Sequence, residues 1–223
     1  MSSSLTARTR WTVGVAFALS VGAMIRYPGG TPLDPTTSGY SLSENFLSDL
    51  GMTVAYDHRP NRLGAGLFVL SLLLLVVGLG HALVQIAHRL SEHSAARRWA
   101  GAAVLCGVFV CVAFAGVAVT PENRDMSVHA SLALWAFRSM PAVAGFLAVA
   151  SFRSPGLRPR LGTAWVVTAL LLAGYAVFLD CGPSATSAHG LVAQVIAQKV
   201  AAVVVLASML FASQEVDRAL APP

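Results

Sequence analysis

Six long apolar stretches constrain this chain more than any other feature of its sequence. A helix rises about 1.5 Å per residue, so roughly 20 mainly apolar residues cross the hydrocarbon core of a bilayer, which is about 30 Å thick. The stretches cover residues 11–25, 63–87, 99–119, 128–152, 161–179 and 189–212. The first also fits the core of a signal peptide, but no clean small-x-small cleavage site follows it, and we expect an uncleaved helix. The sequence predicts one all-α, polytopic membrane domain over residues 1–223, with six transmembrane helices.

Composition excludes the soluble classes of protein. The chain is 56% hydrophobic and 11% charged, whereas a soluble domain carries about 25% charged residues. Its formal net charge of +5 would suit a nucleic-acid binder, but so apolar a chain does not. We expect membrane lipids and no nucleic acid as partners. The sequence leaves open whether the chain forms a homo-oligomer or joins a partner membrane subunit.

The basic residues predict the orientation of the helices. Cytoplasmic loops of membrane proteins carry an excess of Lys and Arg. If the N-terminus is cytoplasmic, four arginines lie in outer segments and nine in inner ones, namely Arg8, Arg10, Arg89, Arg97, Arg98, Arg153, Arg158, Arg160 and Arg218. We therefore expect a multi-pass protein with cytoplasmic N- and C-termini.

The first outer loop, residues 26–62, is too long for a simple connector. Ser41-Leu-Ser-Glu44 matches a capping box and Gly51 suits a C-terminal cap, so a helix of nearly three turns is predicted between them. Its apolar side would hold Leu42, Phe46, Leu47 and Leu50, and its polar side Ser41, Asn45, Ser48 and Asp49. This pattern predicts a short amphipathic helix at the outer interface, or a lid that covers the bundle.

Two cations lie deep in predicted spans, where an ionisable group is costly and needs a reason. Arg138 is near the middle of the fourth span and Lys199 is comparably deep in the sixth. Arg138 faces away from His129 on an ideal helix, so it is expected to pair with an outer carboxylate, a backbone carbonyl or a lipid headgroup. Lys199, with Gln194 and Gln198, suits either a polar ligand or contacts between helices.

His129 and His189 open the fourth and sixth spans, and several carboxylates lie in the same outer segments. Our leading hypothesis is an outward-facing polar site for a lipid headgroup or small polar ligand, with binding candidates Glu44, Asn45, Arg138, Asp180, Gln194 and Lys199. In a simpler interpretation, each histidine caps its helix or hydrogen-bonds a loop.

Two other functions use these residues differently. A metal-dependent intramembrane lipid hydrolase would draw its catalytic groups from Ser48, Asp49, His129 and His189, with zinc held by His129, His189 and Asp49. Otherwise the sequence requires no cofactor. The third interpretation is a small transporter or accessory membrane subunit, in which Arg138 and Lys199 matter more than the histidines.

Several segments resemble a known family. Residues 40–51, with Asn61 leading into a Leu-rich span, look like the outer loop of the domain-of-unknown-function 998 family. The turn 119–122, followed by His129, is similar to that family's entry to the fourth span, and Gln198-Lys199 also fits. The resemblance covers nearly the whole layout and implies a six-helix integral protein of a prokaryotic cell membrane. It implies no reaction.

A fainter resemblance concerns the alkaline ceramidase and progestin-receptor superfamily of membrane hydrolases. These proteins combine a Ser, an Asp and three His at one membrane face, for which Ser48, Asp49, His129 and His189 would be the counterparts. That superfamily has seven helices and an HxxxH pair in the last one, and this chain has neither, which puts zinc binding in doubt.

Overall fold

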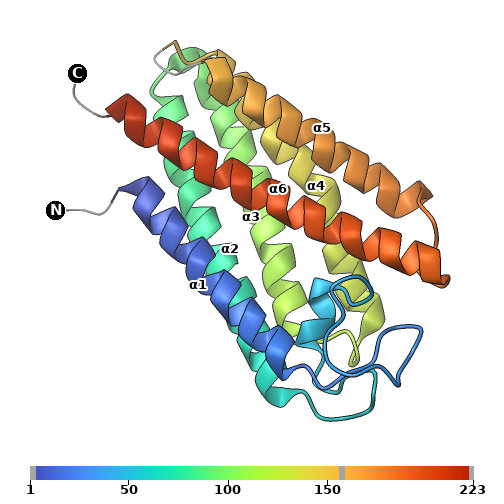
Figure 1. Cartoon of the computed structure of the whole chain (residues 1–223). Helices are drawn as coiled ribbons and strands as arrows, with labels where there is room; N and C mark the ends of the chain where they lie inside the picture. The colour runs from blue at the N-terminus through green and yellow to red at the C-terminus, as the bar shows by residue number, and fades with distance from the viewer. Residues whose placement is uncertain (1–3, 156–158, 221–223) are drawn as a thin grey trace.

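The computed structural model describes residues 4–155 and 159–220, in which six long helices run beside one another (Figure 1). The elements are α1 (Leu5–Arg26), η1 (Leu47–Gly51), α2 (Arg62–Ser91), α3 (Ser94–Val119), α4 (Met126–Phe152), α5 (Pro159–Cys181) and α6 (Ala188–Leu220), of which η1 is a short 3-10 helix. Each predicted apolar stretch lies within one α-helix. Arg158, one of the nine arginines assigned to inner segments, lies outside the described residues.

Consecutive helices pack against each other, and α6 also contacts α1 and α2, so the bundle closes on itself. Figure 1 places both chain ends at one end of the bundle and the long connection between α1 and α2 at the other. We call these the termini end and the loop end.

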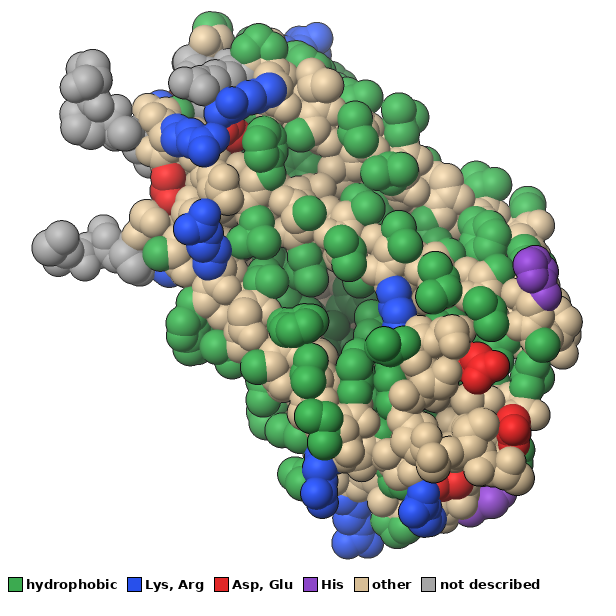
Figure 2. All heavy atoms as spheres, in the orientation of Figure 1, with side chains coloured by type: hydrophobic (Ala, Val, Ile, Leu, Met, Phe, Trp, Pro, Cys, Tyr) green, Lys and Arg blue, Asp and Glu red, His purple; other side chains and the backbone are tan. Residues whose placement is uncertain are grey.

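The surface of the bundle suits contact with lipid. Five helices, α2 to α6, are long and apolar enough to cross a membrane, and large apolar side chains such as Leu105, Val77 and Leu170 point outward. Figure 2 shows hydrophobic side chains spread over the visible face, with most charged side chains toward the two ends and one basic side chain beside the central hollow. The chain is therefore a multi-pass, all-helical membrane protein. α1 is as long as a span, but Arg8 and Arg10 in its first turns lower its apolar character.

Polar contacts join α1 to α6 at the termini end. The Asp217 carboxylate accepts hydrogen bonds from the backbone N–H groups of Leu5 (3.2 Å) and Thr6 (2.8 Å). A carboxylate is favourable there because a helix N-terminus carries unpaired N–H groups and a partial positive charge. One turn further along, the hydroxyls of Thr9 and Ser213 lie 3.0 Å apart. These contacts hold the two helices together where the chain begins and ends.

The main hydrophobic core fills the same half of the bundle. Its fully buried members include Ile86, Leu90, Leu147 and Leu161, from α2, α4 and α5. A second cluster lies beneath the loop, where Leu50 packs with Phe68 and neighbouring side chains. A cavity lies in the middle of the bundle, between these two packed regions.

The connection of residues 27–61 is a compact cap rather than a free loop. Asn61 Nδ2 donates to the carbonyl oxygens of Leu50 (3.0 Å) and Met52 (2.9 Å), which fastens the second half of the cap to the start of α2. Gly30 has a φ of +83°, and a Cβ at this position would lie 2.6 Å from the Asp57 backbone nitrogen. The two halves of the cap approach this closely only because Gly30 has no side chain.

The predicted amphipathic helix over residues 41–50 is replaced by turns and by the five-residue η1, so that prediction is wrong in extent and in orientation. Its supposed polar side turns inward, with Asn45 and Asp49 fully buried, while Leu42 is 65% exposed. The physical reason is local competition: Asn45 and Asp49 bond nearby backbone N–H groups, which offers the chain an alternative to helix.

Two glycine substitutions test how the cap is built. Gly30→Ala should destabilise the protein by about 3 kcal/mol or more, because a left-handed backbone and a backbone clash act together. Gly39→Ala is the matched control: Gly39 also has a positive φ (+69°), but nothing lies within 4 Å of its added Cβ. It should cost only about 1–2 kcal/mol. Thermal unfolding in detergent compares them, and equal losses would contradict the close approach at Gly30.

Candidate functional site

Asn45 is the centre of a buried polar network inside the cap. Its side chain is fully buried and makes three hydrogen bonds. Oδ1 accepts from the Ser41 backbone N–H (2.9 Å), and Nδ2 donates to the Gly30 carbonyl (3.0 Å) and to Asp49 Oδ2 (2.9 Å). A single amide therefore ties three segments of the cap together.

Asp49 is the most unusual titratable group of the cap. It is fully buried, and its Oδ2 also accepts from the Phe46 backbone N–H (3.0 Å), which caps η1. Its other oxygen, Oδ1, is buried without a hydrogen-bond partner. Burial, and then the nearby charge of Glu122, raise the pKa of Asp49 well above its ordinary value.

The cap rests on α6 through two neighbouring residues. Gln198 Oε1 accepts from the Leu47 backbone N–H (2.8 Å), and Lys199 Nζ donates to the Asn45 carbonyl (2.6 Å). The Lys199 ammonium also lies 5.4 Å from the centre of the Tyr40 ring, within range of a cation–π contact. These contacts explain why a lysine lies deep in an apolar helix. Of the two interpretations that the sequence left open, a structural contact fits Lys199 and Gln198 better than a ligand contact.

His129 links the start of α4 to the turn that precedes it. Its Nδ1 lies 2.7 Å from the Thr120 carbonyl oxygen, and because a carbonyl can only accept, Nδ1 carries the proton. Its Nε2 is buried without a hydrogen-bond partner and lies 3.9 Å from Glu122 Oε2. Glu122 Oε1 accepts from the Tyr56 hydroxyl (3.1 Å).

Three tyrosines complete the polar layer beneath the cap. The Tyr40 hydroxyl donates to the carbonyl oxygens of Asn45 and Phe46, whereas the Tyr27 hydroxyl is buried without a partner. Burial, followed by the charge of Asp49, raises the pKa of Tyr27, Tyr40 and Tyr56 above the ordinary value. All three are therefore neutral hydroxyls at physiological pH.

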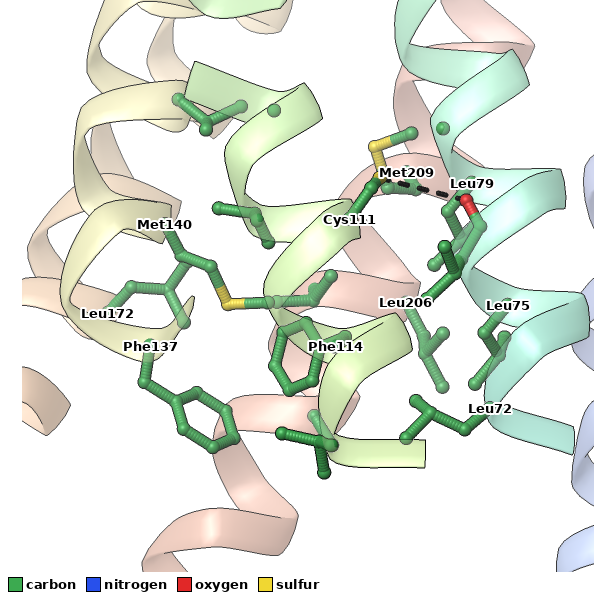
Figure 3. Close-up of a pocket in the computed structure, with 18 of the residues that line it drawn as sticks. Leu72, Leu75, Leu79, Cys111, Phe114, Phe137, Met140, Leu172, Leu206 and Met209 are labelled. Carbon is green, nitrogen blue, oxygen red and sulfur yellow. Dashed lines mark hydrogen bonds between the residues drawn. The ribbon is translucent and has the colours of Figure 1, made fainter. Parts of the chain in front are cut away.

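A cavity of about 270 Å³ lies in the bundle directly below η1. Most of its wall is apolar and comes from α2 to α6, as Figure 3 shows for Leu75, Phe114, Met140 and Leu206. Ser20 adds a contribution from α1. On the face shown in Figure 2, hydrophobic side chains surround a hollow between α1 and α6.

The loop end of this cavity is polar. Ser48 from η1, His129 from α4 and Gln198 from α6 reach its wall there, and the deep end is formed by core residues such as Leu147 and Trp165. Its wall contains no Lys, Arg, Asp or Glu from the described ranges. The site thus has a long apolar part and a short polar part without formal charge.

The remaining predicted site residues lie elsewhere. Arg138 pairs with Asp180 on the exposed side of α4 and α5, as expected for a pairing with an outer carboxylate. His189 is exposed at the start of α6. Gln194 Nε2 donates to the Pro183 carbonyl (3.1 Å) in the turn between α5 and α6. Glu44 accepts from the Ser41 hydroxyl (3.4 Å) at the rim of the cap.

In the hydrolase alternative, His129, His189 and Asp49 would hold zinc. Within residues 4–155 and 159–220 no group of three or more His, Cys, Asp or Glu is arranged to hold a metal ion. The structure therefore does not bring these three residues together as a ligand set.

Sequence reasoning missed Glu122 and the three tyrosines as members of the site. Glu122 was only one of several outer acids, and Tyr27, Tyr40 and Tyr56 carried no motif. A usable signal was the position of Tyr27, Tyr40 and Tyr56 in one segment between two spans. Amphipathic rings of this kind are typical of boundaries between water and apolar surroundings.

Comparison with known proteins identifies no relative: no family model, no curated protein and no solved structure matches this chain.

The Asn45 network gives a direct test of the cap. Asn45→Ala removes three buried hydrogen bonds and should destabilise the protein by about 2–4 kcal/mol. Ser43→Ala, two residues away on an exposed side chain, should change stability by less than about 0.5 kcal/mol. Thermal unfolding of the purified variants measures both, and an Asn45 variant as stable as the Ser43 variant would contradict the network.

Proposed function

We propose that this protein binds an amphipathic lipid, with the hydrocarbon tail in the cavity and an uncharged polar head beneath the cap. The observation that carries the proposal is the cavity itself, whose wall is mainly apolar and which has Ser48, His129 and Gln198 at its loop end. The other hydroxyls of the wall are paired with each other, Ser20 with Ser71 and Thr168 with Ser208. Ligand pockets are typically apolar with a few polar groups that fix orientation.

The apolar wall suits a hydrocarbon chain. Leucines, phenylalanines and methionines of five helices surround the space, and a cavity with such a wall favours apolar molecules over water. A hydrocarbon tail can bury its apolar surface here without breaking a hydrogen bond of the protein.

The polar end selects the head. Ser48 and Gln198 supply neutral hydrogen-bonding groups, and the cavity wall lacks formally charged side chains within the described residues. A phosphate or carboxylate would be buried there without a counterion, at a large cost in solvation free energy. A hydroxyl, ester or carbonyl head fits better.

A hollow on the side of the bundle supports this proposal. α1 and α6 are tied at the termini end by Asp217, Thr9 and Ser213, while Ser20, further along α1, already borders the cavity. The hollow in Figure 2 lies between these helices, on a side of the bundle that would face lipid. We propose that the lipid enters there.

We also infer that α1 is a sixth span and that the termini end is cytoplasmic. α1 has 22 residues, enough to cross the hydrocarbon core, and it packs along α2. Arg8 and Arg10, in its first turns, lie at the termini end with most of the other arginines, in line with the positive-inside rule. The cap then faces outward.

Filling the cavity tests the proposal. Ala133 lines the cavity one turn after His129, so Ala133→Phe should abolish labelling by a photoactivatable long-chain alcohol while the protein still folds. Ala142→Phe is the control, because Ala142 is exposed on the same helix and its variant should be labelled like the wild type. Mass spectrometry of the photoproducts measures labelling and locates it.

In the wild type the label should map to cavity residues such as Leu75, Phe114 and Leu206. Labelling that is restricted to outward-facing residues such as Leu105, or that is equal in both variants, would contradict a lipid in the cavity.

A further inference from the structure

Two arginines converge on one tryptophan at the termini end of the bundle. Trp99 lies in the second turn of α3, and its ring centre is 5.0 Å from the guanidinium carbon of Arg98 and 5.8 Å from that of Arg153. Arg98 belongs to α3, whereas Arg153 directly follows α4. Both distances are within the range of a cation–π contact. One ring therefore supports two positive charges that come from different helices.

The packing around Trp99 fixes this arrangement. The ring centre lies 6.0 Å from that of Phe146 in α4, at the edge of the main hydrophobic core. The Ser154 hydroxyl, buried directly after Arg153, lies 3.3 Å from the Leu90 carbonyl oxygen of α2. The end of α4 is thereby held beside the turn that joins α2 to α3. The ring and the backbone of both arginines thus belong to packed parts of the bundle.

The N–H groups of both arginines remain available as donors. Within residues 4–155 and 159–220, the side chains of Arg98 and Arg153 make no ion pair or hydrogen bond, and both residues are exposed. A cation–π contact uses the face of the aromatic ring and not the N–H donors of the guanidinium, of which each arginine has five.

The acidic side chains at this end of the bundle are already engaged. Glu92 pairs with Arg89, and Glu215 pairs with two arginines of α5 and α6. Asp217 accepts from backbone N–H groups at the start of α1. The segments outside the described ranges contain no Asp or Glu. Two guanidinium groups near one ring repel each other, so an anion that does not belong to this chain would stabilise them.

We propose that Arg98, Trp99 and Arg153 form a binding site for the phosphate group of an anionic membrane lipid. The planar fork of a guanidinium matches two phosphate oxygens at once, and the resulting charge-assisted hydrogen bonds are strong. Basic sites between transmembrane helices close to the membrane surface hold anionic headgroups in this way. The phosphate offsets the charge of both arginines while the indole ring holds them near each other.

The surroundings of the site favour a lipid over a soluble phosphate. Tryptophan is typical of the boundary between hydrocarbon and headgroups. Leu105 and Phe109 follow Arg98 after two and three turns on the same face of α3, and they are 74% and 50% exposed. An acyl chain whose headgroup is bound at Arg98 can lie along these apolar side chains.

This site is separate from the cavity. Neither Trp99 nor the two arginines belong to the cavity wall. The site takes a charged headgroup, whereas the lipid that we propose for the cavity has an uncharged one. Either proposal can therefore fail alone.

Calorimetric titration of the purified full-length protein tests the site, in an uncharged detergent at constant ionic strength. The probe is a short-chain phosphatidic acid, which should bind saturably. Phosphatidylcholine with the same chains should bind about tenfold more weakly or less, because its choline cation offsets the phosphate charge. Inorganic phosphate should also bind more weakly, because it has no acyl chain. Inorganic phosphate that binds as tightly as phosphatidic acid would overturn the assignment to a lipid.

Substitutions distinguish a built site from attraction to a basic surface. Arg98→Gln and Arg153→Gln should each weaken the binding of phosphatidic acid about tenfold or more. Arg10→Gln is the matched control, because Arg10 is exposed at the same end but lies on α1. It removes the same charge and should change the affinity less than about threefold. Trp99→Leu keeps every charge, and it should still weaken binding because the guanidinium groups lose their common support.

The outcome rests on the comparison among the arginine variants. Equal losses of affinity in the Arg10 and Arg153 variants would overturn the site, since they would show attraction to overall charge alone. An affinity that neither Arg98→Gln nor Arg153→Gln changes would overturn it as well. Because both arginines are exposed, their substitution should leave the fold intact, so these variants decide even if Trp99→Leu does not fold.

Discussion

Backbone carbonyls away from water need donors, and at the loop end of this bundle the Asn45 carbonyl accepts from the Tyr40 hydroxyl and from an ammonium group in the middle of a helix. Lys199 reaches the Asn45 carbonyl, and its neighbour Gln198 accepts from the Leu47 N–H. These two contacts seat the cap on α6 and bring a positive charge toward Asp49. The position of η1, the roof of the cavity and the buried acidic groups all depend on this attachment.

The cavity lies between two regions in which the helices are joined in different ways. At the termini end the helices meet directly through Asp217 and the Thr9–Ser213 pair, above a dense core. Toward the loop end η1 contacts both α2 and α6. Side chains from the surrounding helices then border a space that they do not fill, although packed protein cores usually contain few voids of this size.

Local sequence rules failed where side chains compete with the backbone. The capping box Ser41–Glu44 and the spacing of Leu42 and Leu50 favoured a helix, but Asn45 and Asp49 turn inward and bond backbone groups. The helical spacing predicts the same residues on the polar side of an amphipathic helix. Periodicity identifies an amphipathic segment, but it cannot tell which face is buried when the polar side chains satisfy one another's hydrogen bonds in the interior.

The sequence by itself determined that the chain is an all-helical, multi-pass membrane protein, because long apolar runs can satisfy their backbone groups in lipid only as helices or barrels. It also singled out Arg138, Lys199, His129 and His189 as polar residues that need partners. Only the tertiary structure decided what those partners are. Arg138 pairs with Asp180, Lys199 contacts the cap, and His129 lies beside Glu122. His189 is exposed at the start of α6 instead. Hydropathy is a property of each segment, whereas hydrogen bonds and charge pairs join segments whose distance in the sequence says nothing about their distance in space.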